Sequence, residues 1–125
     1  MDDANTLIPV NPAIENYMQK LLEKTGHPVL LEMEKLASLS SFPIVGRLIG
    51  AFLETQAKMV NAKRVFEFGS GYGYSAYWFA RAVGEGGRVI CSDSNPINCE
   101  RAEKYLSDAD LWKRLDFRVG KAQDV

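Results

Sequence analysis

One stretch of the sequence combines an acidic residue with regularly spaced glycines. Glu67 is followed by Gly69, Gly71 and Gly73 at every second position, and an apolar run of strand character, Arg64 to Phe68, leads into them. Glycine allows the backbone to turn sharply and a ligand to approach it closely. The helical spacing that follows would point free N–H groups and the positive end of a helix dipole at the loop. We therefore expect the loop to hold a small anionic or zwitterionic ligand.

The glycine spacing separates this loop from two other nucleotide-binding loops. The dinucleotide fingerprint requires Gly-x-Gly-x-x-Gly, but Tyr74 stands at the position of its third glycine and Gly73 comes one residue too early. A P-loop would end in Gly-Lys-Ser or Gly-Lys-Thr, which this stretch does not contain. The pattern disfavours NAD binding and a P-loop, and it leaves a purely structural turn as the alternative.

Two polar residues follow the next predicted strands. Asp93 comes directly after a strand at Arg88 to Ser92, about 20 residues beyond the glycines, where an acidic side chain can accept hydrogen bonds from both hydroxyls of a ribose. A helix-capping or turn role for Asp93 is the alternative. Gln123 follows a third strand at Leu115 to Val119. Because parallel strands bring their carboxyl ends to one edge of a sheet, we expect the glycine loop, Asp93 and Gln123 to meet at one crevice.

The elements that position these residues follow from the hydrophobic periodicity. Apolar residues at helical spacing predict helices that begin near Pro12, Pro28 and Ile44. The second half of the chain then alternates in the order strand, helix, strand, helix, strand. The sequence thus predicts an α/β fold, in which an N-terminal helical region (residues 1–62) precedes a partial Rossmann-like parallel sheet of β-α-β-α-β order (residues 63–125).

Small and aromatic residues indicate how the helices pack. Gly46 and Gly50 lie four residues apart on the third helix, a spacing expected to allow close packing on the sheet. Tyr77 and Trp78 flank the inward stripe of the helix after the glycine loop. For these aromatic residues, packing against a neighbouring helix is favoured over stacking on a ligand.

The composition is that of a globular domain, with 46% hydrophobic and 25% charged residues. A formal net charge of -1 and the lack of a lysine and arginine cluster give no electrostatic signature for nucleic acid or an anionic membrane. No apolar run approaches the roughly 20 residues of a membrane span, and Met1-Asp2-Asp3 lacks the basic start of a signal peptide. Cys91 and Cys99 lack CxxC spacing, which predicts free buried thiols. We expect a cytoplasmic domain that binds neither nucleic acid nor membranes.

The same stretches carry a family resemblance. Arg64 to Ser75, with its Gly-Tyr-Gly-Tyr-Ser ending, Arg88 to Pro96, and Asp116 to Asp124 resemble the cation-dependent class I O-methyltransferases that use S-adenosylmethionine (SAM). That family includes catechol and caffeoyl-CoA O-methyltransferases, and the pattern that starts at Glu67 is similar to the first motif of the class. The resemblance covers residues 43–125. It implies that the chain supplies the cofactor-binding portion of an enzyme that methylates a hydroxyl group of a small molecule.

The resemblance also implies roles for single residues. Glu67 would face the amino-acid end of SAM, Ser75 its carboxylate, and Asp93 the ribose hydroxyls, while Lys121 departs from the family, where an aspartate often follows the glycine. Ala122 and Gln123 would lie beside the adenine. The residues that the resemblance assigns to cofactor binding are Val45, Glu67, Gly69, Ser70, Gly71, Gly73, Ser75, Asp93, Ala122 and Gln123.

Members of the family continue through a fourth strand and later residues that bind a divalent cation and position the acceptor hydroxyl. No such ligand set is present in this sequence, so we assign no catalytic or metal-binding residue and expect a truncated or engineered half that is inactive alone. The fourth strand would flank Arg64 to Phe68, so we expect the chain to cover that edge with its own helices or with another copy.

The expected partners are SAM or S-adenosylhomocysteine and a second copy of the chain, bound through the N-terminal helices or the sheet edge. A non-catalytic, self-associating scaffold with a vestigial nucleotide pocket is the alternative. Loss of SAM affinity on substitution of Glu67 or Asp93 would favour the enzyme portion over the scaffold.

Overall fold

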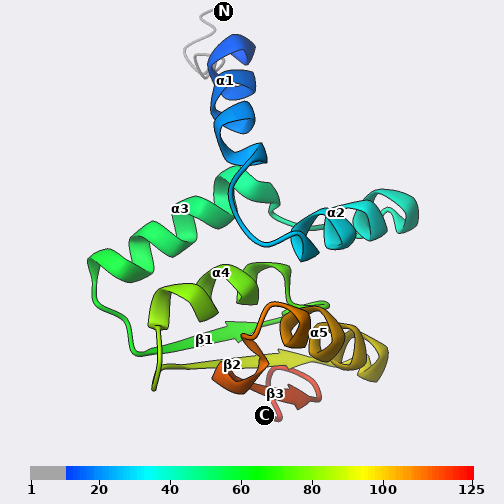
Figure 1. The fold of residues 1–125 in the computed structure, drawn as a ribbon. Coiled ribbons are helices and arrows are strands. Elements are labelled where there is room, and N and C mark those ends of the chain that lie inside the picture. Colours follow the sequence, from blue (N-terminus) through cyan, green and yellow to red (C-terminus); the bar gives the residue numbers. More distant parts are fainter. Residues whose placement is uncertain (1–10) are drawn as a thin grey trace, which may run out of the picture.

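The computed structural model describes residues 11–125, which form α-helices and one parallel sheet (Figure 1). Met1-Asp2-Asp3, on which the expectation about a signal peptide depends, lies outside the described residues. None of the described helices is long and apolar enough to cross a membrane. The elements are α1 (Pro12–Glu23), α2 (Val29–Ser40), α3 (Gly46–Met59), β1 (Arg64–Phe68), α4 (Tyr74–Val83), β2 (Arg88–Asp93), α5 (Pro96–Asp108), a short 3-10 helix (Trp112–Arg114) and β3 (Leu115–Val119).

Two helices begin with the same local signal, an asparagine followed by proline. The side chain of Asn11 accepts a hydrogen bond from the backbone of Ala13 at 2.9 Å, and that of Asn95 accepts one from Ile97 at 3.0 Å. Each asparagine therefore satisfies an N–H group that has no partner within the helix. Proline at the first helical position costs no hydrogen bond, because an N–H group there would have no partner within the helix. The predicted start of α1 is confirmed, and α5 begins with the same signal.

The sheet has the predicted parallel arrangement, with β2 between β1 and β3. Glu67 of β1 lies opposite Cys91 of β2, and Cys91 lies opposite Phe117 of β3. All three strands run in the same direction, so the glycine loop, Asp93 and the segment after Val119 emerge at one edge. The α/β fold class predicted from the sequence is confirmed.

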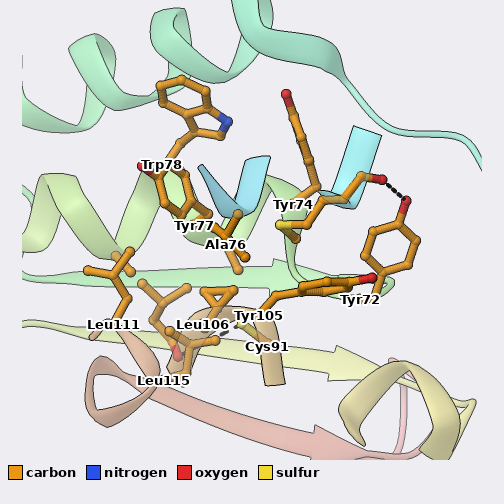
Figure 2. Close-up of a cluster of buried hydrophobic side chains, with 14 of the residues drawn as sticks. Tyr72, Tyr74, Ala76, Tyr77, Trp78, Cys91, Tyr105, Leu106, Leu111 and Leu115 are labelled. Carbon is orange, nitrogen blue, oxygen red and sulfur yellow. Dashed lines mark hydrogen bonds between the residues drawn. The ribbon is translucent and has the colours of Figure 1, made fainter. Parts of the chain in front are cut away.

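The hydrophobic core lies between one face of the sheet and the helices. Val89 and Cys91 of the central strand are fully buried against residues of α4 and α5, including Ala76 and Leu106 (Figure 2). Tyr77 and Trp78 are both buried. The indole ring of Trp78 packs against Gly50 of α3, which confirms the expected packing against a neighbouring helix, whereas the hydroxyl of Tyr77 accepts a hydrogen bond at 2.9 Å from the backbone of His27, between α1 and α2. This core fixes the strand ends that carry the candidate site.

The two glycines of α3 do not bring that helix onto the sheet, contrary to our expectation. A side-chain carbon at Gly50 would overlap the indole ring of Trp78, so Gly50 makes room for a residue of α4. A side-chain carbon at Gly46 would meet nothing within 4 Å. The sheet is covered by α4 and α5, and α3 forms a further layer on α4 (Figure 1). The spacing of the glycines indicated close packing correctly but not its partner.

The strand β1 is an edge strand in this arrangement, as expected from the lack of the fourth strand that flanks it in the family. Phe66 and Phe68 point away from the core and are 49% and 60% exposed. Their rings contact each other, with centroids 4.8 Å apart. Within residues 11–125 the helices pack on the other face of the sheet, so they do not cover this surface, and pairing with another copy stays a prediction.

Candidate functional site

The glycine loop connects β1 to α4 through backbone conformations that favour glycine. Gly69, Gly71 and Gly73 have φ angles of 69°, 55° and 91°. A side chain at Gly71 would also collide with the ring of Phe42. A side chain at Gly73 would press on Ala102 of α5 at 3.2 Å. Of these three loop glycines, only Gly69 has open space where its side chain would be, so it is the one at which a ligand can approach the backbone.

Hydrogen bonds fix the loop against the next strand. The Ser70 amide donates to the Ser92 carbonyl at 2.7 Å, and the Gly71 amide donates to Oδ2 of Asp93 at 2.9 Å. The predicted convergence of the glycine loop and Asp93 is thus present in the fold. Asp93 holds the loop in shape as well as lying at its mouth.

Asp93 shows the turn role that the sequence left open, just before the N-cap residue Asn95 of α5. Its Oδ1 accepts hydrogen bonds from the backbone of Asn95 at 2.9 Å and from the side chain of Asn98 at 3.1 Å. A carboxylate offers about four lone-pair directions, and with the bond from Gly71 three of them are used. The remaining capacity lies on Oδ2, which leaves room for a ligand donor.

Glu67 is the most unusual group of the site. Its Oε2 accepts a hydrogen bond from the Ser75 hydroxyl in the first turn of α4, whereas its Oε1 is buried without a hydrogen-bond partner among the described residues. Burial penalises the charged carboxylate and raises its pKa, an effect that the hydrogen bond from Ser75 opposes. An unpaired buried oxygen is costly, so this position suits a ligand that brings a donor, above all a cationic one.

Two adjoining hollows open at this edge of the sheet. The first has a volume of about 190 Å³ and the second about 260 Å³, and both are bordered by Gly69 and Asp93. Val45 faces the first hollow from the α2–α3 connection, and Ala122 lines the second. An elongated ligand could lie across both, with Gly69 and Asp93 at its middle.

The predicted site residues are therefore not all equivalent. Val45, Gly69, Ser70, Gly71, Ser75, Asp93 and Ala122 line one or both hollows. Glu67 lies behind Ser75, to which it is bonded. Gly73 faces α5, and Gln123 is exposed outside both sets of lining residues.

The sequence analysis missed part of the first wall. Phe42, Pro43, Ile44 and Tyr72 line the hollow together with the glycine loop. The rings of Phe42 and Tyr72 pack with centroids 4.8 Å apart, which joins the α2–α3 connection to the loop. The resemblance that singled out Val45 could have indicated its neighbours, but no periodic pattern marks a short connection of this kind.

Comparisons with known proteins agree with this geometry. A family model described as O-methyltransferase matches residues 13–125. A catechol O-methyltransferase of Niastella koreensis is 32% identical over 114 residues, which cover 90% of this chain and 52% of that protein. The chain thus spans about half the length of this curated relative.

Solved structures give the same result. A methyltransferase from Geobacter sulfurreducens superposes with a TM-score of 0.82 at 34% identity, covering 90% of this chain and 58% of that one. An O-methyltransferase from Streptomyces achromogenes, solved in complex with SAM, superposes with a TM-score of 0.80 at 25% identity and covers 90% and 51%. From its fold, its glycine loop and these matches, the chain belongs to the O-methyltransferase family.

Proposed function

We propose that this chain is the cofactor-binding portion of an O-methyltransferase that transfers a methyl group from SAM to a hydroxyl group of a small molecule. The observation that carries this proposal is the buried oxygen of Glu67 that has no hydrogen-bond partner within residues 11–125, near the end of the strand that enters the glycine loop. The amino group of SAM is a cationic donor of the kind that this oxygen lacks.

The other residues of the site fit the remaining parts of the cofactor. The open backbone at Gly69 allows close approach, and Asp93 has acceptor capacity left for ribose hydroxyls. Ala122 lines the second hollow, where the adenine would lie, and Val45 would contact the methionine portion, whereas Gln123 would have to move to reach the adenine. SAM supplies an activated methyl group when bound, and these residues bind and orient it.

Ser75 needs a different role from the one implied by the resemblance. Its hydroxyl already donates to Glu67, so it is not free to donate to the cofactor carboxylate in this conformation. We propose that Ser75 orients Glu67, and that backbone N–H groups in the first turn of α4 receive the carboxylate.

We further propose that residues 1–125 bind the cofactor without turnover. In the family, the divalent cation and the acceptor depend on a part of the fold that follows β3, and this chain spans about half of the curated relative it matches. Among residues 11–125, no three His, Cys, Asp or Glu side chains gather at a spacing that could hold a metal ion. Turnover would then require the rest of the fold.

Titration calorimetry with S-adenosylhomocysteine tests the proposal. The wild-type chain should bind, and Asp93→Ala should abolish binding. Asp116→Ala is the matched control, because Asp116 is an aspartate of β3 that pairs with Arg118 at 2.8 Å outside both hollows. A folded wild-type chain without affinity would refute the proposal and favour the alternative, a non-catalytic scaffold with a vestigial pocket.

We also propose that the chain forms a homodimer through its N-terminal helices. A groove of about 310 Å³ between α1 and α3 is lined by apolar side chains, and α1 projects from the rest of the structure with no buried residue (Figure 1). A helix of this length is marginal in water unless its apolar face packs against something. The exposed apolar residues of this surface are Ile14, Tyr17, Met18, Leu21, Ile49 and Phe52.

A second copy would cover this apolar surface. Those side chains are between 46% and 63% exposed, and a stable interface buries ~800 Å² of each partner, so a dimer would have to bury this apolar surface together with its polar surroundings. Light scattering should give the mass of a dimer, and Tyr17→Asp should give a monomer, whereas Phe68→Asp at the sheet edge should not. Dissociation only by Phe68→Asp would place the interface at β1, and a monomeric wild-type chain would refute the dimer.

A further inference from the structure

A second group of polar residues, of which Arg47 and Tyr74 are buried and Glu34 is partly buried, lies between the N-terminal helices and the glycine loop. The carboxylate of Glu34 in α2 accepts hydrogen bonds from Nε of Arg47 at 2.7 Å and from its Nη2 at 3.2 Å. The hydroxyl of Tyr74, the first residue of α4, donates to the same carboxylate at 2.7 Å. Arg47 is only 8% exposed and Tyr74 only 3%. One carboxylate therefore joins the start of α3 to the residue that ends the glycine loop.

Arg47 extends the network to the end of α1. Its Nη1 donates to the backbone carbonyls of Leu22, Glu23 and Thr25 at 3.2, 3.2 and 3.1 Å. These carbonyls lie in the last turn of α1 and just beyond it, where a helix leaves acceptors unsatisfied. The planar guanidinium can serve Glu34 and these carbonyls at once, which an ammonium group could not do with the same geometry.

Glu34 and Arg47 lie before and after the connection that forms one wall of the first hollow. The connection from Phe42 to Val45 leaves α2 eight residues after Glu34 and ends two residues before Arg47. Across the hollow, Tyr72 donates to the backbone carbonyl of Met33 at 2.9 Å, the dashed line beside Tyr72 in Figure 2. The two loop tyrosines thus reach consecutive residues of α2, Met33 and Glu34.

We propose that Glu34 is a positioning residue for the cofactor. Through Arg47 and Tyr74, it fixes the spacing between the wall at residues 42–45 and the glycine loop, and that spacing sets the affinity for SAM and S-adenosylhomocysteine. This inference rests on the proposed cofactor binding. Loss of the carboxylate leaves the buried guanidinium without its counter-charge and removes the link between residues 42–45 and the glycine loop. The protein without ligand then spends less time in the conformation that binds the cofactor.

Three variants and one control test the role of Glu34. Glu34→Gln removes the negative charge. Arg47→Lys keeps the positive charge but cannot donate to Glu34 through two nitrogen atoms, and Tyr74→Phe removes only the hydroxyl group. Glu54→Gln is the matched control, because Glu54 is also an acid of the helical layer that pairs with basic side chains, Lys58 at 2.6 Å and Arg81 at 3.4 Å, but these partners do not line either hollow. A general loss of stability should affect control and test variants alike.

The first measurement needs no ligand. Amide hydrogen exchange of the free protein should become faster in residues 42–46 and 70–75 for Glu34→Gln and Arg47→Lys, with a smaller change for Tyr74→Phe and none for the control. Equal exchange in Glu34→Gln and Glu54→Gln would overturn the proposal. Tyr74→Phe keeps the test decisive if Glu34→Gln does not fold, because it deletes a single oxygen atom.

The second measurement is the affinity for S-adenosylhomocysteine by calorimetry. Glu34→Gln should weaken binding about tenfold, as expected for the loss of charged hydrogen bonds, while Glu54→Gln binds like the wild type. Unchanged affinity in Glu34→Gln would overturn the proposal even if exchange increases. A wild-type chain that does not bind S-adenosylhomocysteine refutes the proposed function instead. Hydrogen exchange then still decides whether Glu34 links residues 42–45 to the glycine loop.

Discussion

The sharpest prediction concerns Glu67, where folding and cofactor binding place opposite demands on one side chain. One carboxylate oxygen is bonded to Ser75 and the other is buried without a partner among the described residues. Substitution by glutamine keeps the shape and an acceptor for Ser75 but removes the charge. We expect Glu67→Gln to be more stable than the wild type by about 1 kcal/mol at pH 7, since a buried unsatisfied group costs ~1–3 kcal/mol and more when it is charged, while the weakened bond to Ser75 and the unpaired amide of the glutamine offset part of that gain.

The pH dependence of this gain follows from the direction of the pKa shift. The pKa of Glu67 is raised in the folded chain because burial disfavours its charged form. Its contribution to stability is therefore fully present below the ordinary glutamic acid pKa of about 4.3 and is lost as the pH rises through the raised value. The gap between Glu67→Gln and the wild type should be largest at neutral pH and close to zero near pH 4. Ser75→Ala removes a donor and should shift this transition to higher pH.

Thermal unfolding and calorimetry measure the two demands separately. A gain of about 1 kcal/mol corresponds to roughly 3–6 °C in Tm for a domain of this size. The same variant should bind S-adenosylhomocysteine about 10- to 150-fold more weakly, because a hydrogen bond to a charged group contributes ~1.5–3 kcal/mol. If Glu67→Gln is less stable at pH 7, or the gap does not shrink on acidification, the hydrogen bond from Ser75 outweighs burial. Unchanged affinity would remove Glu67 from the binding site.

Three further predictions concern packing and chemistry. Asp93→Ala should cost about 1–3 kcal/mol in urea unfolding even without cofactor, because an amide of the glycine loop loses its acceptor, and a neutral effect would contradict that role. Gly50→Ala should cost about 1–3 kcal/mol by the same measurement through its overlap with Trp78, and unchanged stability would mean that α3 shifts freely on α4. Burial raises the pKa of Cys91 to about 12, so at pH 8 a thiol reagent should modify only the half-buried Cys99 in the folded chain and both cysteines after unfolding, and rapid reaction of both in the native state would show that the core opens.

Local signals in the sequence were sufficient for much of the fold. The strands at residues 64–68 and 115–119 have the predicted bounds, and the Asn-Pro starts of α1 and α5 are in place. These features depend on residues close together in the chain, such as a cap, a proline or an alternation of apolar side chains. The expectation of an apolar edge at β1 followed from the strand order and was also met.

Features that depend on contacts between distant residues were harder to predict. Gly50 gave a correct signal for close packing, but its partner, Trp78, lies in another helix. The network of Glu34, Arg47 and Tyr74 was not predicted at all, because nothing in the sequence relates a glutamate of one helix to a tyrosine 40 residues later.

The sequence by itself determined the family, the order of strands and helices, and the group of residues at the carboxyl edge of the sheet, since each follows from local spacing and the handedness of parallel crossovers. Only the tertiary structure decided how those residues share their hydrogen bonds. Asp93 holds the loop as well as facing the hollows, Ser75 is taken by Glu67, and one oxygen of Glu67 is left over. The physical reason is that lone pairs and N–H groups are assigned by three-dimensional proximity, which the spacing of residues along a chain does not specify.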